Sequence, residues 1–191
     1  MSEDDVFHVM MRGSDHQPMF WDDEDRIKLL VLKKEIMARF EGKVKGFCLM
    51  TTHTHDLFKC KKIQEMSTML HNAYSGYLAK KYGLKKPLDF PLKIIPKSVI
   101  SWQMDNLCYI LNNAVMAGLC KSAGGYKWNS YLFYTRRSTV LSQYIDVDVS
   151  LVKDCYPDLE DFKIMLAKKL DYEREMAVVD KGGFGATWTR D

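Results

Sequence analysis

The order of short apolar runs and longer amphipathic segments in the first 118 residues constrains the fold more than any other sequence feature. Short apolar runs between glycine, proline or turn residues are typical of strands, and apolar residues at helical spacing over longer stretches indicate helices. The expected elements are a strand at 6–12, a helix at 23–40, strands at 44–50 and 53–60, a helix at 64–82, a strand at 91–96 and a helix at 101–118. This order predicts an α+β fold, a ferredoxin-like antiparallel sheet with helices on one face and an open second face.

Residues at the ends of these segments support the boundaries. Asp22 and Asp23 are candidate N-caps for the first helix, and Gly83 stands where the second helix should end. Residues 51–52, both threonine, form the expected tight turn between the two middle strands. Prolines at both ends of the run 91–96 predict an edge strand, because proline cannot donate a hydrogen bond within a sheet.

The chain length of 191 residues suits one compact domain with a short appendage. We expect residues 1–134 to form the domain and residues 135–191 to form a C-terminal helical extension, whose role the sequence does not assign. One or two helices are expected within 150–172. The glycine-rich stretch 182–185 is typical of a loose tail.

Composition excludes several classes of protein. A hydrophobic content of 47% is enough for a sizeable core, and a net charge of +3 does not by itself indicate nucleic-acid binding. The five cysteines form no C-x-x-C pair, which argues against a structural zinc site or a disulfide framework. The acidic start resembles no leader, and no apolar run reaches the ~18 residues of a membrane helix. We therefore expect a reduced, cytoplasmic protein without a membrane partner.

The segment M-T-T-H-T-H-D-L-F-K carries a histidine pair, His53 and His55. Side chains alternate between the faces of a strand, so these two imidazoles should lie on the same side and could reach one divalent ion. Two ordinary surface histidines would give the same pattern, and the residues alone leave both interpretations open. The other histidines, His8, His16 and His71, show no ligand spacing and are interpreted as ordinary residues.

The expected helix at 101–118 has a clear apolar stripe. At helical spacing this stripe contains Met104, Leu107, Cys108, Leu111, Val115 and Gly118. Tyr109 and Asn113 lie roughly opposite the stripe and are one helical turn apart, so one site could use both. A tyrosine in a helix is more often a packing residue, and the periodicity alone does not distinguish the two roles.

Four segments, in order, resemble the REP-associated tyrosine transposases, part of the HUH single-tyrosine transposase group of bacterial insertion sequences. F-H-V-M-M-R-G-S-D-H-Q-P-M-F is similar to the family's first strand, and F-C-L-M-T-T-H-T-H to the strands leading into its H-x-H motif. Y-I-L-N-N-A-V-M-A-G resembles the tyrosine helix, and Y-K-W-N-S-Y a motif that follows it. The similarity runs from Phe7 to about Tyr134.

The resemblance implies a role for several residues. Tyr109 matches the nucleophile, His53 and His55 match the metal-binding histidines, and Asn113 matches the polar residue that completes the metal site. The residues that would contact DNA phosphates are Arg12, Lys93 and Lys97. The resemblance further implies Mg²⁺ with Mn²⁺ as a substitute, single-stranded or hairpin DNA as the partner, and a bacterial, nucleoid-associated protein. Related transposases act either alone or as a homodimer in which the tyrosine serves the partner's histidines.

The chemistry of DNA strand transfer accounts for these residue types. A tyrosine that attacks phosphorus retains the phosphodiester energy in a 5′-phosphotyrosine and releases a 3′-hydroxyl. Free tyrosine, with a pKa of about 10, is a poor nucleophile at neutral pH. A divalent ion would polarise the phosphate and stabilise the leaving oxygen. The substrate should be unpaired, because a stacked duplex holds its phosphates away from a helix-borne tyrosine; the open sheet face would hold the bases.

Three positions depart from the family pattern. Residues 51–52 replace Pro-Asn before the first histidine, and Ala114 replaces the proline after Asn113. Thr54 and Asp56 stand where apolar residues are usual, and Asp56 should face the helices, where an unpaired carboxylate is costly. Either the strand ends or bulges there, or Asp56 has a partner such as a lysine or a backbone amide.

The sequence leaves three functions open. The first is metal-dependent cleavage and rejoining of single-stranded DNA through Tyr109. The second is a diverged or domesticated protein of the same fold that binds DNA without cleaving it; RNA-binding domains of this shape carry aromatic pairs on central strands, and only Phe7 and Phe47 come near that pattern. The third is a small hydrolase that uses a metal-bound water at His53 and His55, for which no third strong ligand or general base is evident.

Overall fold

The computed structural model describes residues 5–136 and 138–181. The expected elements all form, with boundaries within about three residues of those expected. The strands are β1 (Val6–Arg12), β2 (Lys43–Leu49), β3 (His53–Lys59) and β4 (Lys93–Pro96), and the longer helices are α1 (Asp23–Arg39), α2 (Ile63–Tyr82) and α3 (Ile100–Met116). Beyond them lie α4 (Tyr131–Thr135), α5 (Ser150–Cys155) and α6 (Leu159–Lys181). The stretch 182–185, expected to be a loose tail, lies outside the described residues.

The four strands form one antiparallel sheet in the order β2-β3-β1-β4. This is the ferredoxin-like order, so the predicted α+β fold class is confirmed. β4 is an edge strand, as the prolines at both ends of the run 91–96 indicated; Pro96 is its last residue, and Pro91 precedes it by two residues. The register places Met10 opposite His55 and Arg12 opposite His53, so β1 and β3 present these side chains on one face of the sheet.

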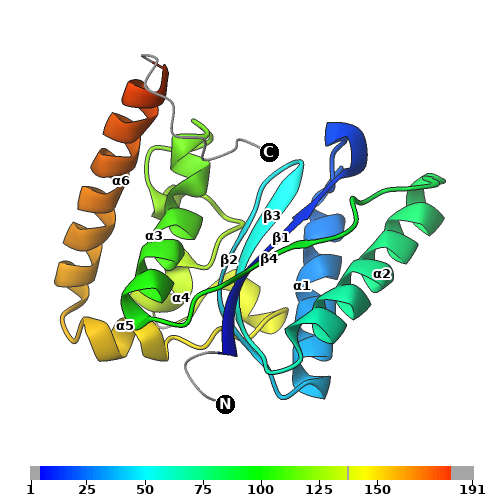
Figure 1. Ribbon diagram of the computed structural model, residues 1–191, viewed down its shortest axis with the longest axis horizontal. Helices are drawn as coiled ribbons and strands as arrows, with labels where there is room; N and C mark the ends of the chain where they lie inside the picture. Colours follow the sequence, from blue (N-terminus) through cyan, green and yellow to red (C-terminus); the bar gives the residue numbers. More distant parts are fainter. Residues whose placement is uncertain (1–4, 137, 182–191) are drawn as a thin grey trace.

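Helices α1 and α2 cover one face of the sheet and lie side by side (Figure 1). Asp22 caps α1 in a reciprocal arrangement with Asp25, in which each side chain accepts a hydrogen bond from the other residue's backbone. Gly83, at φ 69°, ends α2 in the left-handed conformation that glycine adopts without strain. Both helix boundaries therefore follow from signals that the sequence contains.

The second face of the sheet is not open along its whole width, contrary to expectation. Helix α3 packs on the β2–β3 half of that face, and α6 packs on the outer side of α3 (Figure 1). Gly46 of β2 permits the close approach, because a Cβ there would lie 2.5 Å from a Leu107 methyl carbon. The apolar stripe of α3 explains why this face is partly covered. The stripe is stabilised by burial against an apolar surface, and the second face of the sheet provides that surface. Strands β1 and β4 have few contacts with α3 and leave their half of this face more accessible.

The C-terminal helices share a core with α3. Leu151, Val152, Phe162 and Leu166 are buried in the same apolar cluster as the α3 stripe. The side chain of Asn112 also donates a hydrogen bond of 3.1 Å to the backbone carbonyl of Leu166. The described part of the chain contains no helix long and apolar enough to cross a membrane.

The structure decides between the alternatives for Asp56. Strand β3 continues to Lys59, and the one register shift lies in β2, between Val44 and Gly46. The Asp56 carboxylate instead pairs with Lys33 of α1 at 2.5 Å and accepts a hydrogen bond from Thr54 at 3.0 Å. A lysine partner for Asp56, one of the alternatives that the sequence left open, is therefore confirmed.

Candidate active site

The histidine pair lies on the sheet face that α3 covers. His53 and His55 point to the same side of β3, with their ring centroids 5.0 Å apart. His55 is almost completely buried, whereas His53, at the end of the strand, is half-buried. The spacing on the strand thus brings two imidazoles together, as the H-x-H pattern indicated.

Helix α3 places the candidate nucleophile against this pair. The Tyr109 ring meets the His55 ring edge to face, with centroids 5.2 Å apart and planes 88° apart. The Asn113 side chain, one turn further along the helix, lies close enough to the Tyr109 phenol to lower its pKa. Tyr109 is 39% exposed although it touches a buried histidine, so an outside ligand can reach it. One chain therefore brings together Tyr109, Asn113, His53 and His55.

A third histidine, which the sequence did not single out, belongs to this cluster. Nε2 of His8 lies 3.0 Å from Nδ1 of His55, and the two rings stack with centroids 5.2 Å apart. On its other side, Nδ1 of His8 accepts a hydrogen bond of 3.2 Å from the Asn106 side chain. Strand register explains why His8 is there. Met10 lies opposite His55, so His8, two residues earlier on β1, is a diagonal neighbour of His55 on the same face.

Burial sets the charge of the histidines. It lowers the pKa of His8 to about 4 and holds the pKa of His55 well below its ordinary value, and positive neighbours add to both shifts. Burial and the charge of Arg12 also lower the pKa of His53. The three imidazoles are therefore neutral at pH 7, and a neutral imidazole is the form that binds metal ions.

Opposing effects act on the pKa of the Tyr109 phenol. Burial raises this pKa, the Asn113 side chain lowers it, and the charges of Glu173 and Cys48 add to the rise. The free protein therefore holds a neutral phenol at pH 7, which is a poor nucleophile. Activation of this tyrosine needs a positive charge or a base brought close to its oxygen.

The histidines fit a divalent ion in one respect in particular. Nδ1 of His53 is 3.1 Å from the Thr52 hydroxyl, and Nδ1 of His55 is held by His8. Metal-binding histidines are commonly oriented by such a partner on the second nitrogen, which leaves Nε2 for the ion. No cluster of three or more His, Cys, Asp and Glu side chains suited to a metal occurs within 5–136 and 138–181. A divalent ion at this pair would therefore need the Asn113 amide oxygen and water as further ligands, a set that suits Mg²⁺ or Mn²⁺.

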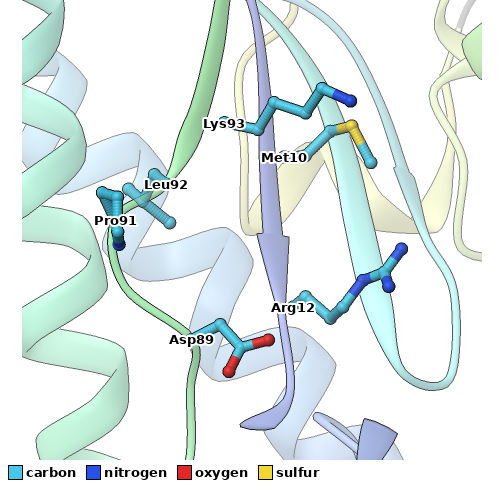
Figure 2. A pocket seen from close by; sticks show the side chains of 6 residues that line it. All are labelled: Met10, Arg12, Asp89, Pro91, Leu92 and Lys93. Carbon is cyan, nitrogen blue, oxygen red and sulfur yellow. The ribbon is translucent and has the colours of Figure 1, made fainter. Parts of the chain in front are cut away.

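Basic residues line the accessible half of the same face. Figure 2 shows Met10, Arg12 and Lys93 extending to one side of β1, beside a hollow of about 240 Å³ that Asp89 and the 91–92 loop complete. Lys97 lies outside this hollow, directly after β4, but its charge reaches His8. The three basic residues singled out in the sequence thus flank the histidine cluster from the β1–β4 side.

Comparison with known proteins gives support at the level of fold. The chain matches no protein-family model and no curated protein sequence. It is similar to a solved structure of a REP-associated tyrosine transposase bound to a REP hairpin, with a TM-score of 0.59 and 9% identity, over 76% of this chain and 87% of that one. A likeness to tRNA(His) guanylyltransferase from Saccharomyces cerevisiae, with a TM-score of 0.35, 12% identity and coverage of 63% and 68%, supports no argument. This likeness therefore shows a shared fold.

Proposed function

We propose that the protein is a single-tyrosine DNA strand transferase of the transposase kind. It would cleave and rejoin single-stranded or hairpin DNA through a 5′-phosphotyrosine on Tyr109. The observation that carries this proposal is the contact between Tyr109 and His55, with His53 and Asn113 beside them in the same chain. The fold shared with a hairpin-bound tyrosine transposase adds support.

The reaction transfers a phosphoryl group from a DNA 3′ oxygen to Tyr109 and then back to a 3′ oxygen. The Tyr109 oxygen attacks phosphorus and loses its proton, the bond from phosphorus to the 3′ oxygen breaks, and the 3′-hydroxyl leaves carrying a proton. Attack by a 3′-hydroxyl on the phosphotyrosine reverses these steps and rejoins a strand. Mg²⁺, with Mn²⁺ as a substitute, bound by His53, His55 and Asn113 would polarise the phosphate and stabilise the leaving oxygen.

The surroundings of the site suit an unpaired strand. Arg12, Lys93 and Lys97 would neutralise backbone phosphates on the accessible half of the sheet. Trp102 lies two helical turns before Tyr109 on α3 and is 56% exposed, so its ring is available to stack on a base. The strand would therefore run along the exposed face of α3 and across β1 toward β4.

The geometry favours action within one chain. Tyr109 already lies against His55 of its own chain, so a homodimer is not needed to complete the site. Residues 1–134 would then form the catalytic domain. The extension at 135–191 would hold α3 on the sheet, because α6 packs against its outer side.

The test is incubation with 5′-labelled and 3′-labelled hairpin-bearing single-stranded DNA and Mg²⁺, followed by denaturing electrophoresis. A covalent adduct that retains the fragment 3′ to the cut should form, and both Tyr109→Phe and His53→Ala should reduce its formation at least ~100-fold. Tyr172→Phe, at an exposed tyrosine of α6, is the matched control and should leave it unchanged. Tight DNA binding with no adduct under any divalent ion would contradict the proposal and favour a binding protein.

A further inference from the structure

The hydrogen bonds around His8 form a buried chain that leads to the candidate metal site. Asn106 of α3, His8 of β1 and His55 of β3 are 8%, 5% and 2% exposed, and the two links between them measure 3.2 Å and 3.0 Å. Water is therefore excluded from both links. Each neutral imidazole carries a single proton, so the direction of one hydrogen bond fixes the direction of the next.

With the Asn106 amide nitrogen placed toward Nδ1 of His8, the chain of hydrogen bonds runs in the direction that disfavours metal binding. The Asn106 amide nitrogen donates to Nδ1 of His8, so the proton of His8 resides on Nε2 and is donated to Nδ1 of His55. The proton of His55 must then reside on its own Nε2, which is the nitrogen left for an ion. A protonated nitrogen has no free electron pair to offer a metal.

A half-turn of the Asn106 amide reverses the chain. The Asn106 Oδ1 atom is buried and has no hydrogen-bond partner among the described residues. After the half-turn this oxygen accepts from Nδ1 of His8, Nε2 of His8 accepts from Nδ1 of His55, and Nε2 of His55 is free. Each arrangement leaves one polar atom of the amide unpaired, so the two make equal numbers of hydrogen bonds.

We propose that Asn106 and His8 form a tautomer switch that decides whether His55 can bind a divalent ion. His8 is a positioning residue, since it is buried and acts through its link to His55. The metal-free protein adopts the direction seen here, and binding of the ion selects the reversed direction. This inference rests on the proposed metal site, but it concerns metal binding alone and requires no DNA.

The first measurement is Mn²⁺ affinity, read from the electron paramagnetic resonance signal of free Mn²⁺. His8→Phe removes the partner of His55 and should weaken binding about 10–100-fold. Asn106→Asp places an obligatory acceptor beside His8, which favours the reversed direction, and should tighten binding about 10-fold. In the His8→Phe background the same Asn106→Asp change should act less than about 2-fold, because its effect passes through His8. His71→Phe, at a buried histidine of α2, is the control for packing loss and should bind as the unchanged protein does.

The second measurement is the proton position, read from long-range ¹H–¹⁵N spectra of the histidine rings with and without Mg²⁺. His55 should carry its proton on Nε2 in the metal-free protein and on Nδ1 in the loaded protein. A His55 proton on Nδ1 in both states, or equal Mn²⁺ affinity for His8→Phe and the unchanged protein, would overturn the switch and leave the proposed strand transfer intact. Failure of the unchanged protein to bind Mn²⁺ would overturn both the switch and the metal site, whereas loss of the DNA adduct alone would count only against strand transfer.

Discussion

The two faces of strand β3 use polar residues in opposite ways. On the face toward α1, Asp56 has two partners, Lys33 and Thr54, and all three side chains are buried. On the face toward α3, His53 and His55 each have one nitrogen held, while no hydrogen bond from the described residues reaches their Nε2 atoms. One face satisfies its polar groups within the protein, and the other leaves ring nitrogens without a protein partner, available to something outside it. We infer that the first set stabilises the fold and the second serves function.

The largest effect on stability is expected on the face of β3 toward α1. Burial raises the pKa of Asp56 and lowers that of Lys33, and the attraction between the two opposes both shifts. Asp56→Ala would leave Lys33 buried without its partner and should lower the free energy of unfolding by about 3–5 kcal/mol. Chemical denaturation at pH 7 measures this loss.

Replacing both members of the ion pair is the control. The double variant Lys33→Met, Asp56→Leu buries no charge and should unfold within about 1 kcal/mol of the unchanged protein. His53→Ala, on the other face, should change the free energy of unfolding by less than about 1 kcal/mol while it reduces DNA cleavage. A large loss of stability in His53→Ala with none in Asp56→Ala would reverse the comparison.

A smaller effect is expected at Glu173 of α6, which forms no ion pair within the described residues, although the charge of Lys169 acts on it. One carboxylate oxygen of Glu173 is buried without a hydrogen-bond partner among the described residues, and burial raises its pKa to about 7. The folded state therefore binds this proton more tightly than the unfolded state, whose pKa is near 4.5. The resulting stabilisation is complete below about pH 4.5 and is lost as the pH rises through 7.

Replacement of Glu173 tests that sign. Glu173→Gln should raise the free energy of unfolding at pH 8 by about 1–2 kcal/mol, after allowance for partial solvent screening, and should have little effect at pH 4.5. Glu175→Gln, at an exposed position of the same helix, is the matched control. Equal stabilisation at both pH values would show that the carboxylate is not the cause.

The smallest effect is expected at Arg12, opposite His53 in the sheet register. Arg12→Ala removes one phosphate contact and should weaken binding of single-stranded DNA only about 2–5-fold at moderate salt. The slope of log affinity against log salt concentration should fall by about 0.7. Fluorescence anisotropy at several salt concentrations measures both quantities. Arg39→Ala, at the exposed end of α1, should change neither, and an equal effect there would mean that binding is nonspecific.

Most of the fold could be predicted from the sequence, because local signals determine where the helices and strands begin and end. The Asp22 cap, Gly83 and Pro96 each act within a few residues of their own position, and each stands at an element boundary. The position of α3 was harder to predict. Its apolar stripe predicts burial but not the face of the sheet on which the helix packs. The packing of Leu107 on Gly46 joins segments far apart in the sequence, which no local pattern predicts.

The candidate site was predictable where spacing alone determined it. His53 and His55 are two residues apart on one strand, and Tyr109 and Asn113 are one turn apart on one helix. His8 was missed because its link to His55 depends on strand register, which no local pattern fixes. Lys33 was missed for a similar reason, since its partner Asp56 lies 23 residues further along the chain.

The most direct test of the account is to locate the DNA attachment by mass spectrometry of the protease-digested adduct. A single modified peptide is expected, with a nucleotide 5′-phosphate on Tyr109, among the 10 tyrosines of the chain. Attachment at another residue, or an adduct that persists in Tyr109→Phe, would contradict the central claim that Tyr109 and the histidine pair form one active site.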